Sequence, residues 1–533
     1  MRSVMEHSFA NVPRATIPRS SFNRSHGYKT TFDADYLIPV LVDDVIPGDT
    51  FNVNMTFFAR LATPLHPIMD NMYLDSFFFF VPYRLVWSNW EKMHGAQDDP
   101  SDSIDYTVPV VTGTNTYTAE GSLWDYFGLP LDNKSGVSLD PDNVTVSALP
   151  FRAYSLIWSE WFRDENLQDT ALITLGDGPD GLTDFGSATA GFVGATLAKR
   201  GKRHDYFTSC LPWPQKGDAV TMPLGTNAPL YTTTGAGGVF EIQDAVGSAN
   251  TGNIVSSNVG FNATFNSIAA GSANIFADLS NATASTINDL RLAFQTQRLL
   301  ERDARSGTRY NELILSHFGV TVPDFRVQRP EFLGGGSSPV NINPVANTSE
   351  DATSKQGDLT AFGTVSGSHG FTKSFVEHGV IIGLVNVRSD ITYSQGIERY
   401  WSKQTRYDFF YPVLAQIGEQ SVLNGEIWTQ GTATDDDVFG YQERYAEYRY
   451  KPSRLTGLMA VDAAGSLSPW HLSEDFTSLP TLGSTFIKSN TGAPLNRAIA
   501  VPTQPHFIFD SYISMKCARP MPLYGVPGNL DHF

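Results

Sequence analysis

The sequence is short of cysteine, of charge and of long apolar runs, and each shortage excludes a class of protein. Two cysteines in 533 residues, Cys210 and Cys517, exclude a disulfide framework and fit a reducing compartment. The most apolar short run, residues 77–81, is far below the roughly 18 residues that a membrane helix needs. The first thirty residues contain no apolar core of a secretion signal. We therefore expect a protein that is made and assembled in the cytosol.

Sequence motifs for catalysis are also scarce. We find no hydrolase nucleophile elbow, no phosphate-binding loop and no clustered cysteine or histidine. Residues 176–181 match the spacing Gly-x-Gly-x-x-Gly, but Pro179 interrupts the match and no helical pattern follows, which favours an ordinary loop. The sequence therefore predicts a protein that is not an enzyme, with no catalytic residue, no resident metal and no cofactor.

Two acidic loops leave one ionic alternative open. Asp177, Asp180 and Asp184, or the three aspartates at 435–437, could offer carboxylate oxygens to Ca²⁺. Neither spacing matches an EF-hand, so plain surface loops are the simpler interpretation. A divalent cation at an interface between subunits stays an alternative.

The overall composition indicates a folded protein with extensive interfaces. Hydrophobic residues make up 41% and charged residues 17%, against about 25% charged in ordinary domains. Aromatic residues reach 12%, and the cores of protein–protein interfaces favour aromatics while excluding charge. The formal net charge is −18, so any contact with nucleic acid must be local. The length corresponds to two or three ordinary domains, or to one domain with large insertions.

Strand patterns occur near both ends of the chain, and helical patterns lie between them. Apolar and polar residues alternate through residues 51–57, which predicts a strand with one buried face. Three further apolar stretches, 76–81, 379–387 and 506–516, predict buried strands. If these strands share a core, the middle of the chain is inserted between them. Helical spacing predicts helices over residues 151–166, 287–305 and 309–318.

Two segments concentrate basic residues. The first, residues 1–30, has no regular period and should stay flexible unless a partner orders it. Its cations suit phosphate and its rings suit unpaired bases, although it could equally thread onto a neighbouring subunit. The second, residues 199–204, could bind phosphate or pair with some of the 55 acidic residues. The cations of the first segment, opposed only by Glu6, are Arg2, Arg14, Arg19, Arg24 and Lys29.

Residues 224–286 differ in composition from the rest of the chain. Of these 63 residues, 42 are Gly, Ala, Ser, Thr or Asn, and three are charged. Apolar residues such as Val239, Phe240, Phe261 and Phe265 recur between the small ones. We expect short strands that pack against copies of themselves, because one such segment has too little apolar mass for its own core.

Five stretches of the sequence carry a resemblance to a known family. Residues 149–168, from Leu-Pro-Phe-Arg-Ala-Tyr to Glu-Asn-Leu-Gln, resemble the major capsid protein of the gokushoviruses, small single-stranded DNA phages of the Microviridae. The other four stretches follow in the family's order, and the similarity extends from Arg14 to Phe533. They are residues 203–217, 337–349, 435–453 and 517–528.

The resemblance implies a fold and an assembly. The fold is a mainly β, eight-stranded antiparallel jelly roll of the viral capsid type, with long inter-strand insertions and a few helices. Sixty copies would form a T=1 icosahedral virion around single-stranded DNA, assembled in the cytoplasm of the bacterial host. Implied partners are a small basic internal DNA-binding protein, an internal scaffolding protein, a pilot protein and a host cell-surface receptor.

The resemblance also gives the expected domain boundaries and sites. Residues 1–30 would be a basic arm, and 31–533 one jelly-roll domain in which 224–286 protrudes at the threefold axis. We expect Arg14, Arg19, Arg24 and Lys29 to contact DNA or the internal protein. The receptor-facing residues would be Val239, Phe240, Phe261 and Phe265. The alternative is a β-rich phage adhesin or fibre protein, which would share the segment 224–286 but need no basic arm.

Overall fold

The chain forms two compact units, residues 1–214 with 320–533 and residues 215–319. This division differs from the single domain expected over 31–533.

No helix among the described residues is long and apolar enough to cross a membrane. The computed structural model describes residues 18–96, 99, 101, 103–113, 117–131, 144–171, 173–184, 186–187, 192–193, 196–218, 220, 230–232, 275–277, 287–305, 316, 328–350 and 355–524.

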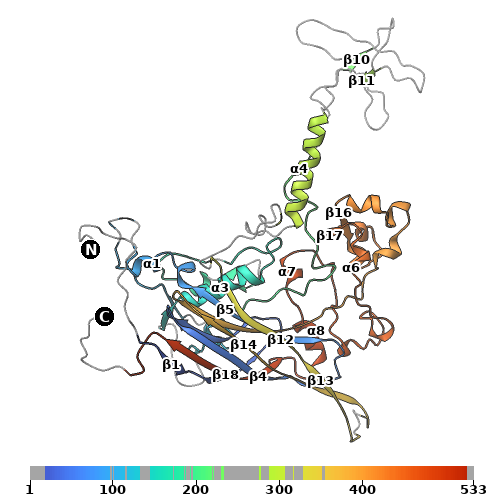
Figure 1. Ribbon diagram of the computed structural model, residues 1–533. Coiled ribbons are helices and arrows are strands. Elements are labelled where there is room, and N and C mark those ends of the chain that lie inside the picture. The colour runs from blue at the N-terminus through green and yellow to red at the C-terminus, as the bar shows by residue number, and fades with distance from the viewer. Residues whose placement is uncertain are drawn as a thin grey trace, which may run out of the picture. The chain divides into compact units, whose positions relative to one another are not determined.

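Two antiparallel sheets form the centre of the first unit (Figure 1). In the six-stranded sheet, β1 and β2 both pair with β18, followed by β4, β14 and β13; the four-stranded sheet has the order β12-β5-β15-β3. The strands of the first sheet are β1 (Ser20–Asn23), β2 (His26–Phe32), β4 (Thr50–Leu61), β13 (Asn341–Ala346), β14 (Leu359–Ser374) and β18 (Phe507–Arg519). Those of the second are β3 (Ile38–Val45), β5 (Met72–Pro82), β12 (Glu331–Pro339) and β15 (Gly379–Ser389).

The chain moves back and forth between these sheets in the order of a jelly roll. Strands β2, β4, β14 and β18 lie in one sheet and β3, β5, β12 and β15 in the other, with antiparallel pairing throughout. The predicted β-rich, antiparallel jelly-roll class is therefore confirmed. Because β1 and β13 extend the first sheet, the described residues place ten strands in the two sheets, and the count of eight is not confirmed.

Alternation along the strands places the main core between the two sheets. In β4, Phe51, Val53, Met55 and Phe57 are buried, and the residues between them are exposed. Phe57 stacks on Phe509 of β18, with 5.9 Å between the ring centroids. Burying one such side chain contributes about 1.5–3 kcal/mol. Strands from opposite ends of the chain thus share one core, as the sequence pattern predicted.

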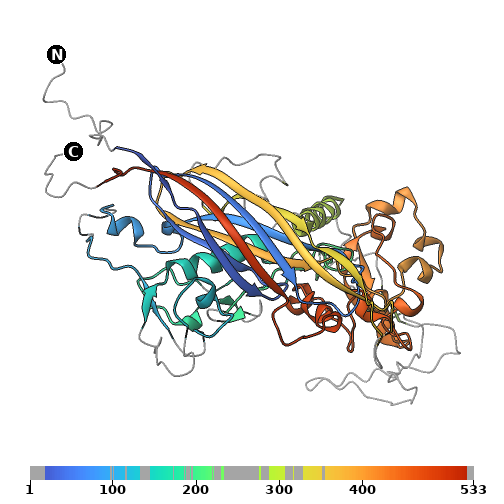
Figure 2. The same ribbon diagram turned by 90° about the horizontal axis from the view of Figure 1, so that it is seen from below.

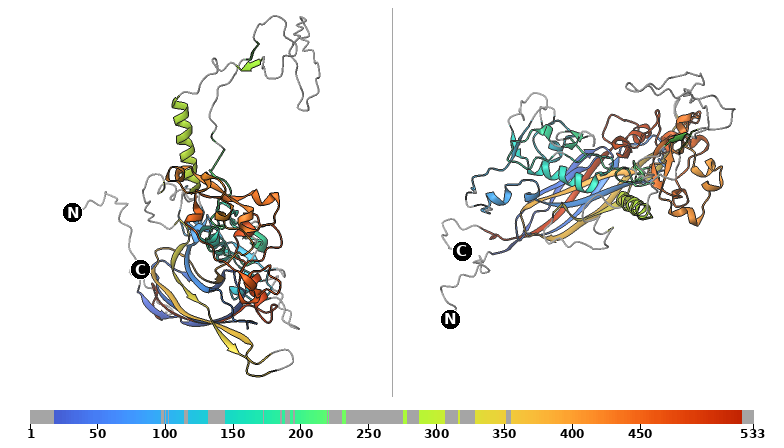
Figure 3. Two further views of the ribbon diagram at one scale, coloured as in Figure 1. Left: turned by 90° about the vertical axis from the view of Figure 1, so that its right-hand side faces the viewer. Right: turned by 90° about the horizontal axis from the view of Figure 1, so that it is seen from above.

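The four-stranded sheet is covered on both faces. The six-stranded sheet is covered on one face and open on the other. Strands β5 and β15 are buried along almost their whole length, which explains their continuous apolar runs. Helix α3 (Leu149–Ile157) and the π-helical turn η3 (Trp158–Phe162) belong to the cluster that covers this sheet. The helix predicted over 151–166 is thus confirmed, although it ends at residue 162. Figure 3 shows the insertions of the first unit gathered on one side of the sandwich.

Short elements make up the rest of the insertions. Before β12 they are η1 (Tyr83–Leu85), α1 (Trp90–Met93), β6 (Val110–Thr112), α2 (Leu123–Tyr126), β7 (Thr145–Ser147), η4 (Leu182–Asp184), β8 (Gly186–Ser187) and β9 (Phe192–Val193). Between β15 and β18 they are η6 (Arg399–Ser402), η7 (Arg406–Asp408), η8 (Pro412–Gln416), β16 (Glu419–Leu423), α6 (Asn424–Ile427), η9 (Ala433–Asp436), β17 (Val438–Glu443), η10 (Ala446–Tyr448), η11 (Gly457–Met459), η12 (Ser468–Trp470), α7 (Ser484–Ile487) and α8 (Gly492–Ala498).

The second unit contains the insertion around residues 224–286. Strands β10 (Leu230–Thr232) and β11 (Ile275–Ala277) pair antiparallel, and α4 (Ile287–Arg305) has the predicted bounds. The helix predicted over 309–318 lies outside the described residues except for residue 316.

The expected arm differs from the structure over part of its length. Residues 20–23 and 26–30 lie in β1 and β2, because their backbone pairs with β18. Residues 1–17 lie outside the described residues.

Candidate assembly and nucleic-acid surfaces

The basic run at 199–204 is held inside the first unit by acidic partners. Arg200 forms an ion pair with Asp75 and places its guanidinium over Phe77. Burial is the main influence on Arg200 and lowers its pKa, although Asp75 opposes that shift. Lys202 lies 2.9 Å from Glu474, and both side chains are almost fully buried. Of the two interpretations of this run, pairing with acidic residues is the one that the structure supports.

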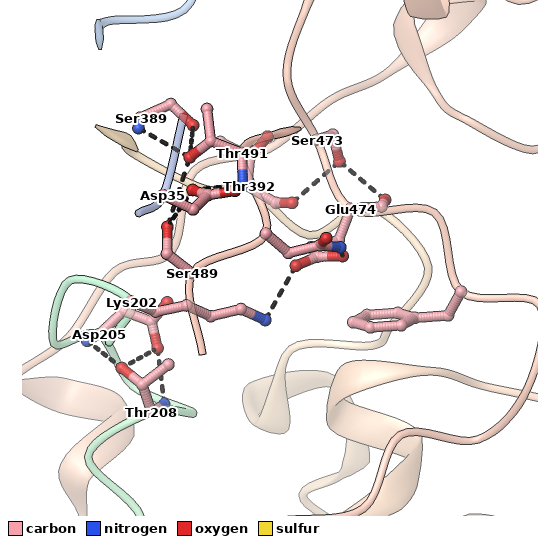
Figure 4. Close-up of polar contacts among 12 residues, drawn as sticks. Asp35, Lys202, Asp205, Thr208, Ser389, Thr392, Ser473, Glu474, Ser489 and Thr491 are labelled. Atoms are coloured by element: carbon pink, nitrogen blue, oxygen red, sulfur yellow. Dashed lines mark hydrogen bonds and ion pairs between the residues drawn. The ribbon is translucent and has the colours of Figure 1, made fainter. Parts of the chain in front are cut away.

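A buried polar network continues from this run (Figure 4). The Asp35 carboxylate accepts hydrogen bonds from the Ser489 hydroxyl at 2.6 Å, the Thr491 N–H at 3.0 Å and the Gly492 N–H at 2.8 Å. The Thr491 hydroxyl oxygen in turn accepts the Ser389 N–H at 3.0 Å. These bonds hold the loops after β15 and before α8 against the start of β3. The network thus joins the insertions to the sandwich through buried hydrogen bonds.

The expected DNA-contacting residues divide into two groups. Arg24 forms an ion pair of 2.5 Å with Asp43, which is buried, and Arg19 donates to the carbonyl of Gly48. Lys29 instead lies on the open face of the six-stranded sheet, 77% exposed, with Asp510 at 3.4 Å. Arg14 lies outside the described residues. Arg19 and Arg24 therefore make contacts within the subunit near the turn before β4, whereas the side chain of Lys29 is exposed to solvent.

The open face of the six-stranded sheet, named here the open sheet face, was not predicted as a site. Figure 2 looks onto it, with β18 in red, β4 in blue and β14 in gold lying in front. The period-2 pattern of residues 508–516 was the signal that could have shown it, since it alternates Ile508, Asp510 and Tyr512 with core residues. The outward residues of its four long strands are Gly27, Lys29, Thr31, Thr50, Asn52, Asn54, Thr56, Phe58, Arg60, Thr360, Phe362, Thr364, Ser366, Ser368, Gly370, Thr372, Ser374, Ile508, Asp510, Tyr512, Ser514 and Lys516.

Exposed rings also gather in the insertion between β15 and β18, and we name this set the aromatic loop cluster. Trp401 is 69% exposed and Tyr407 is 67% exposed, so most of each ring lies outside the core of the subunit. A cavity of about 310 Å³ opens beside Trp401. The sequence signal was the spacing of rings through residues 400–411, which was not singled out. The cluster consists of Tyr400, Trp401, Tyr407, Phe409, Phe410, Tyr411, Tyr448 and Tyr450.

Three of the carboxylates considered for a cation already have partners in the protein. Asp177 accepts hydrogen bonds from Asn89 at 2.8 Å and from the Trp87 indole at 2.7 Å, and these bonds lower its pKa. Asp180 pairs with the buried Arg152 at 2.7 Å, and Asp435 accepts from the backbone of residues 430 and 431. The predicted receptor-facing residues lie outside the described residues: Val239, Phe240, Phe261 and Phe265.

Comparison with known proteins identifies the family. Residues 10–529 match the family model described as Capsid protein (F protein). Capsid protein VP1 of Bdellovibrio phage phiMH2K is 47% identical over 547 residues, which cover 99% of this chain and 98% of that protein. VP1 of Chlamydia phage 1 is 43% identical over 594 residues, covering 99% and 98%, and VP1 of Spiroplasma virus 4 is 35% identical over 548 residues, covering 98% and 97%. The chain therefore belongs to the phage capsid protein (F protein) family, and it is a capsid protein of the gokushovirus type rather than an enzyme.

Proposed function

We propose that sixty copies of this chain form a closed T=1 shell around a single-stranded DNA genome. The observation that supports this most strongly is a jelly roll that matches capsid proteins over nearly its whole length. A jelly roll presents long loops at its ends, where they can meet several neighbouring copies. Closed symmetry then repeats each modest contact throughout the shell. The adhesin or fibre alternative receives no support from these relatives.

The test is the architecture and the stoichiometry of purified particles. Electron microscopy should show closed icosahedral shells, and mass measurement of emptied shells should give sixty copies of the 58.5 kDa chain. Rods or free trimers would instead favour the fibre alternative.

We further propose that the aromatic loop cluster is buried between copies in this shell. Interface cores are enriched in Tyr, Trp and Phe, and this cluster exposes such rings over two stretches of chain, residues 400–411 and 448–450. The basic residues nearby are already engaged within the subunit: Lys403 lies 2.9 Å from Glu447, and Arg399 lies 2.8 Å from Glu426. The cluster thus presents rings whose neighbouring charges are largely neutralised, which suits contact with a second copy.

For the insertion we propose a protrusion at the threefold axis that contacts the host receptor. Its composition supports this, since small residues predominate and apolar ones recur among them. Helix α4 of the same unit exposes Leu292, Phe294 and Leu299, which three copies could bury together. Replacing residues 224–286 with a short Gly-Ser loop should leave shells intact by electron microscopy and abolish adsorption to cells. Normal adsorption of such particles would refute the receptor assignment.

Inside the shell we propose that Arg14, Arg19, Arg24 and Lys29 lie toward the genome or toward a small basic internal protein. The support is charge, because a shell of copies at −18 each must still hold a polyanion, so that cations have to be concentrated on the inner side. Scaffolding and pilot proteins, and assembly in the host cytoplasm, belong to the same proposal. Particles lacking residues 1–19 should form but retain less DNA.

A further inference from the structure

The open sheet face carries a charge opposite in sign to that of the whole chain. Its basic residues are Lys29, Arg60 and Lys516, and its one acidic residue is Asp510. The chain as a whole has 55 acidic residues against 37 basic ones. A sheet face with net positive charge is therefore a local exception in an acidic protein, and it complements a polyanion.

Two of these cations have no acidic partner among the residues that the structure describes. Arg60 and Lys516 are exposed and form no ion pair with any residue that the structure describes. Elsewhere in the first unit cations are commonly paired, as Arg152 is with Asp180 and Lys202 with Glu474. Lys29 and Asp510 are both largely exposed at 3.4 Å, so their attraction is weak. Arg60 and Lys516 are thus free to meet charge from outside the subunit.

The same face exposes two aromatic rings in its central strands. Phe58 of β4 is 51% exposed, and Tyr512 of β18 is 57% exposed. Phe58 lies opposite Asp510 and Tyr512 opposite Thr56, which makes the two rings diagonal neighbours on adjacent strands. Because diagonal neighbours on adjacent strands lie about 7–8 Å apart, the two rings can each stack on one of two successive flat groups. The remaining outward residues are mostly Ser, Thr and Asn, which donate hydrogen bonds without adding bulk.

We propose that the open sheet face binds single-stranded DNA, with bases stacked on Phe58 and Tyr512 and phosphates held by Arg60, Lys516 and Lys29. Rings combined with cations and small donors are the composition of surfaces that bind single strands without reading sequence. An interface with a second protein would instead exclude charge from its centre. The proposal rests on the proposed function, since it assigns this face to the interior of the shell.

The test measures binding of a fluorescent twelve-nucleotide oligo(dT) to the full-length, unassembled subunit by anisotropy over a range of salt concentrations. The double variant Phe58→Ala with Tyr512→Ala should bind about tenfold or more weakly, with an unchanged dependence on salt. Arg60→Gln with Lys516→Gln should reduce the slope of log K against log salt by about 1.4, because two phosphate contacts are lost.

Three controls separate stacking from general damage. Tyr512→Phe keeps the ring and should bind within about twofold of the wild type. Tyr407→Ala removes a ring of similar exposure outside the open sheet face and should leave binding unchanged. A duplex hairpin should bind the ring variant and the wild type alike, because its bases are already stacked. Equal oligo(dT) binding by the ring variant, or an equal loss with the hairpin, would overturn the proposal.

Crosslinking of wild-type particles gives a measurement that depends on no variant. Ultraviolet irradiation of filled particles should attach nucleotides to the peptide of residues 507–519. Adducts only elsewhere, or crosslinks from this peptide to an internal protein alone, would overturn the proposal. Failure of the wild type to form closed shells would refute the proposed function instead, because oligo(dT) binding by the subunit is measured without assembly.

Discussion

Asp35 shows how one residue can fasten distant segments. Its φ of 79° lies in the left-handed region, which costs energy for a residue other than glycine, and its carboxylate is almost fully buried. The three hydrogen bonds that this carboxylate accepts from residues 489–492 offset that cost. The backbone takes part as well, since the Arg200 N–H donates to the Asp35 carbonyl at 3.0 Å.

Replacing Asp35 should destabilise the subunit strongly. Asp35→Ala leaves the Ser489 hydroxyl and two backbone N–H groups buried without their acceptor, so we expect a loss of about 3 kcal/mol in the free energy of unfolding. Urea unfolding of the unassembled subunit measures it. Asp510→Asn, at an exposed carboxylate, is the matched control and should change stability by less than about 0.5 kcal/mol. A loss as small for Asp35→Ala would show that the network is not needed.

His506 makes the stability depend on pH. Its Nδ1 accepts the Ala34 N–H at 3.1 Å, and its Nε2 faces the Asn496 side-chain oxygen at 2.8 Å, so the neutral ring fits the site. Burial lowers its pKa below the usual value near 6.5, although Asp33 opposes the shift. Below a pH of about 6.5 the histidine of the unfolded chain therefore binds a proton more readily than that of the folded chain. The free energy of unfolding thus falls as the pH drops below about 6.5.

The His506→Gln variant tests this linkage. Its free energy of unfolding should depend less steeply on pH between about 7 and 5, by at most about 1.4 kcal/mol per pH unit, which is the effect of one proton. His204→Gln, at an exposed histidine, should leave the slope unchanged. Identical slopes in the wild type and His506→Gln would contradict the assignment.

At the scale of elements, the sequence predicted strands wherever side-chain patterns were strong. Strand β4 was visible because its alternation separates core from solvent, and β5 and β15 were visible because burial on both faces makes them continuously apolar. Strand β12 was missed because its three successive glycines resemble a loop. The structure explains them, since a Cβ at Gly335 would lie 2.1 Å from the Ser76 carbonyl oxygen. The glycines of β12 are therefore explained by its close packing against β5. This contact between distant segments cannot be seen in the sequence.

The C-terminal tail gives a prediction at the same scale. Strand β18 ends at Arg519, whose guanidinium lies 3.2 Å from the fully buried Asp49 carboxylate. The tail that follows contains prolines at 520, 522 and 527, which favour an extended conformation that can lie over a neighbouring copy. Truncation after Arg519 should preserve the unfolding midpoint and prevent shell formation. Truncation after Lys516 should also cost the subunit about 3–5 kcal/mol, because Asp49 loses its partner. Thermal unfolding and electron microscopy separate the two effects, and normal shells from the longer truncation would exclude the tail from assembly.

At the scale of the whole molecule, exposed surface was harder to predict than the core. Composition indicated large interfaces and a local cationic region, but it could not place either one. The run at 199–204 is the densest basic sequence, yet its ion pairs lie within the subunit, whereas Arg60 and Lys516 are far apart in sequence and lie on the same sheet face. Pairing between strands of high sequence separation creates that surface, so that a linear pattern does not show it.

The aromatic loop cluster provides the assembly prediction for the whole molecule. Trp401→Ser with Tyr407→Ser removes two rings that are mostly exposed in the subunit, so the free energy of unfolding should change by less than about 1 kcal/mol. In a shell each copy would lose the same contact, so that a loss of about 2 kcal/mol at each interface should abolish closed particles. Sedimentation of assembly reactions measures this outcome directly. Tyr512→Ser, at a ring 57% exposed on the open sheet face and outside the cluster, is the matched control and should affect assembly less. Shells formed by the double variant at wild-type yield would mean that the cluster faces something other than a second copy.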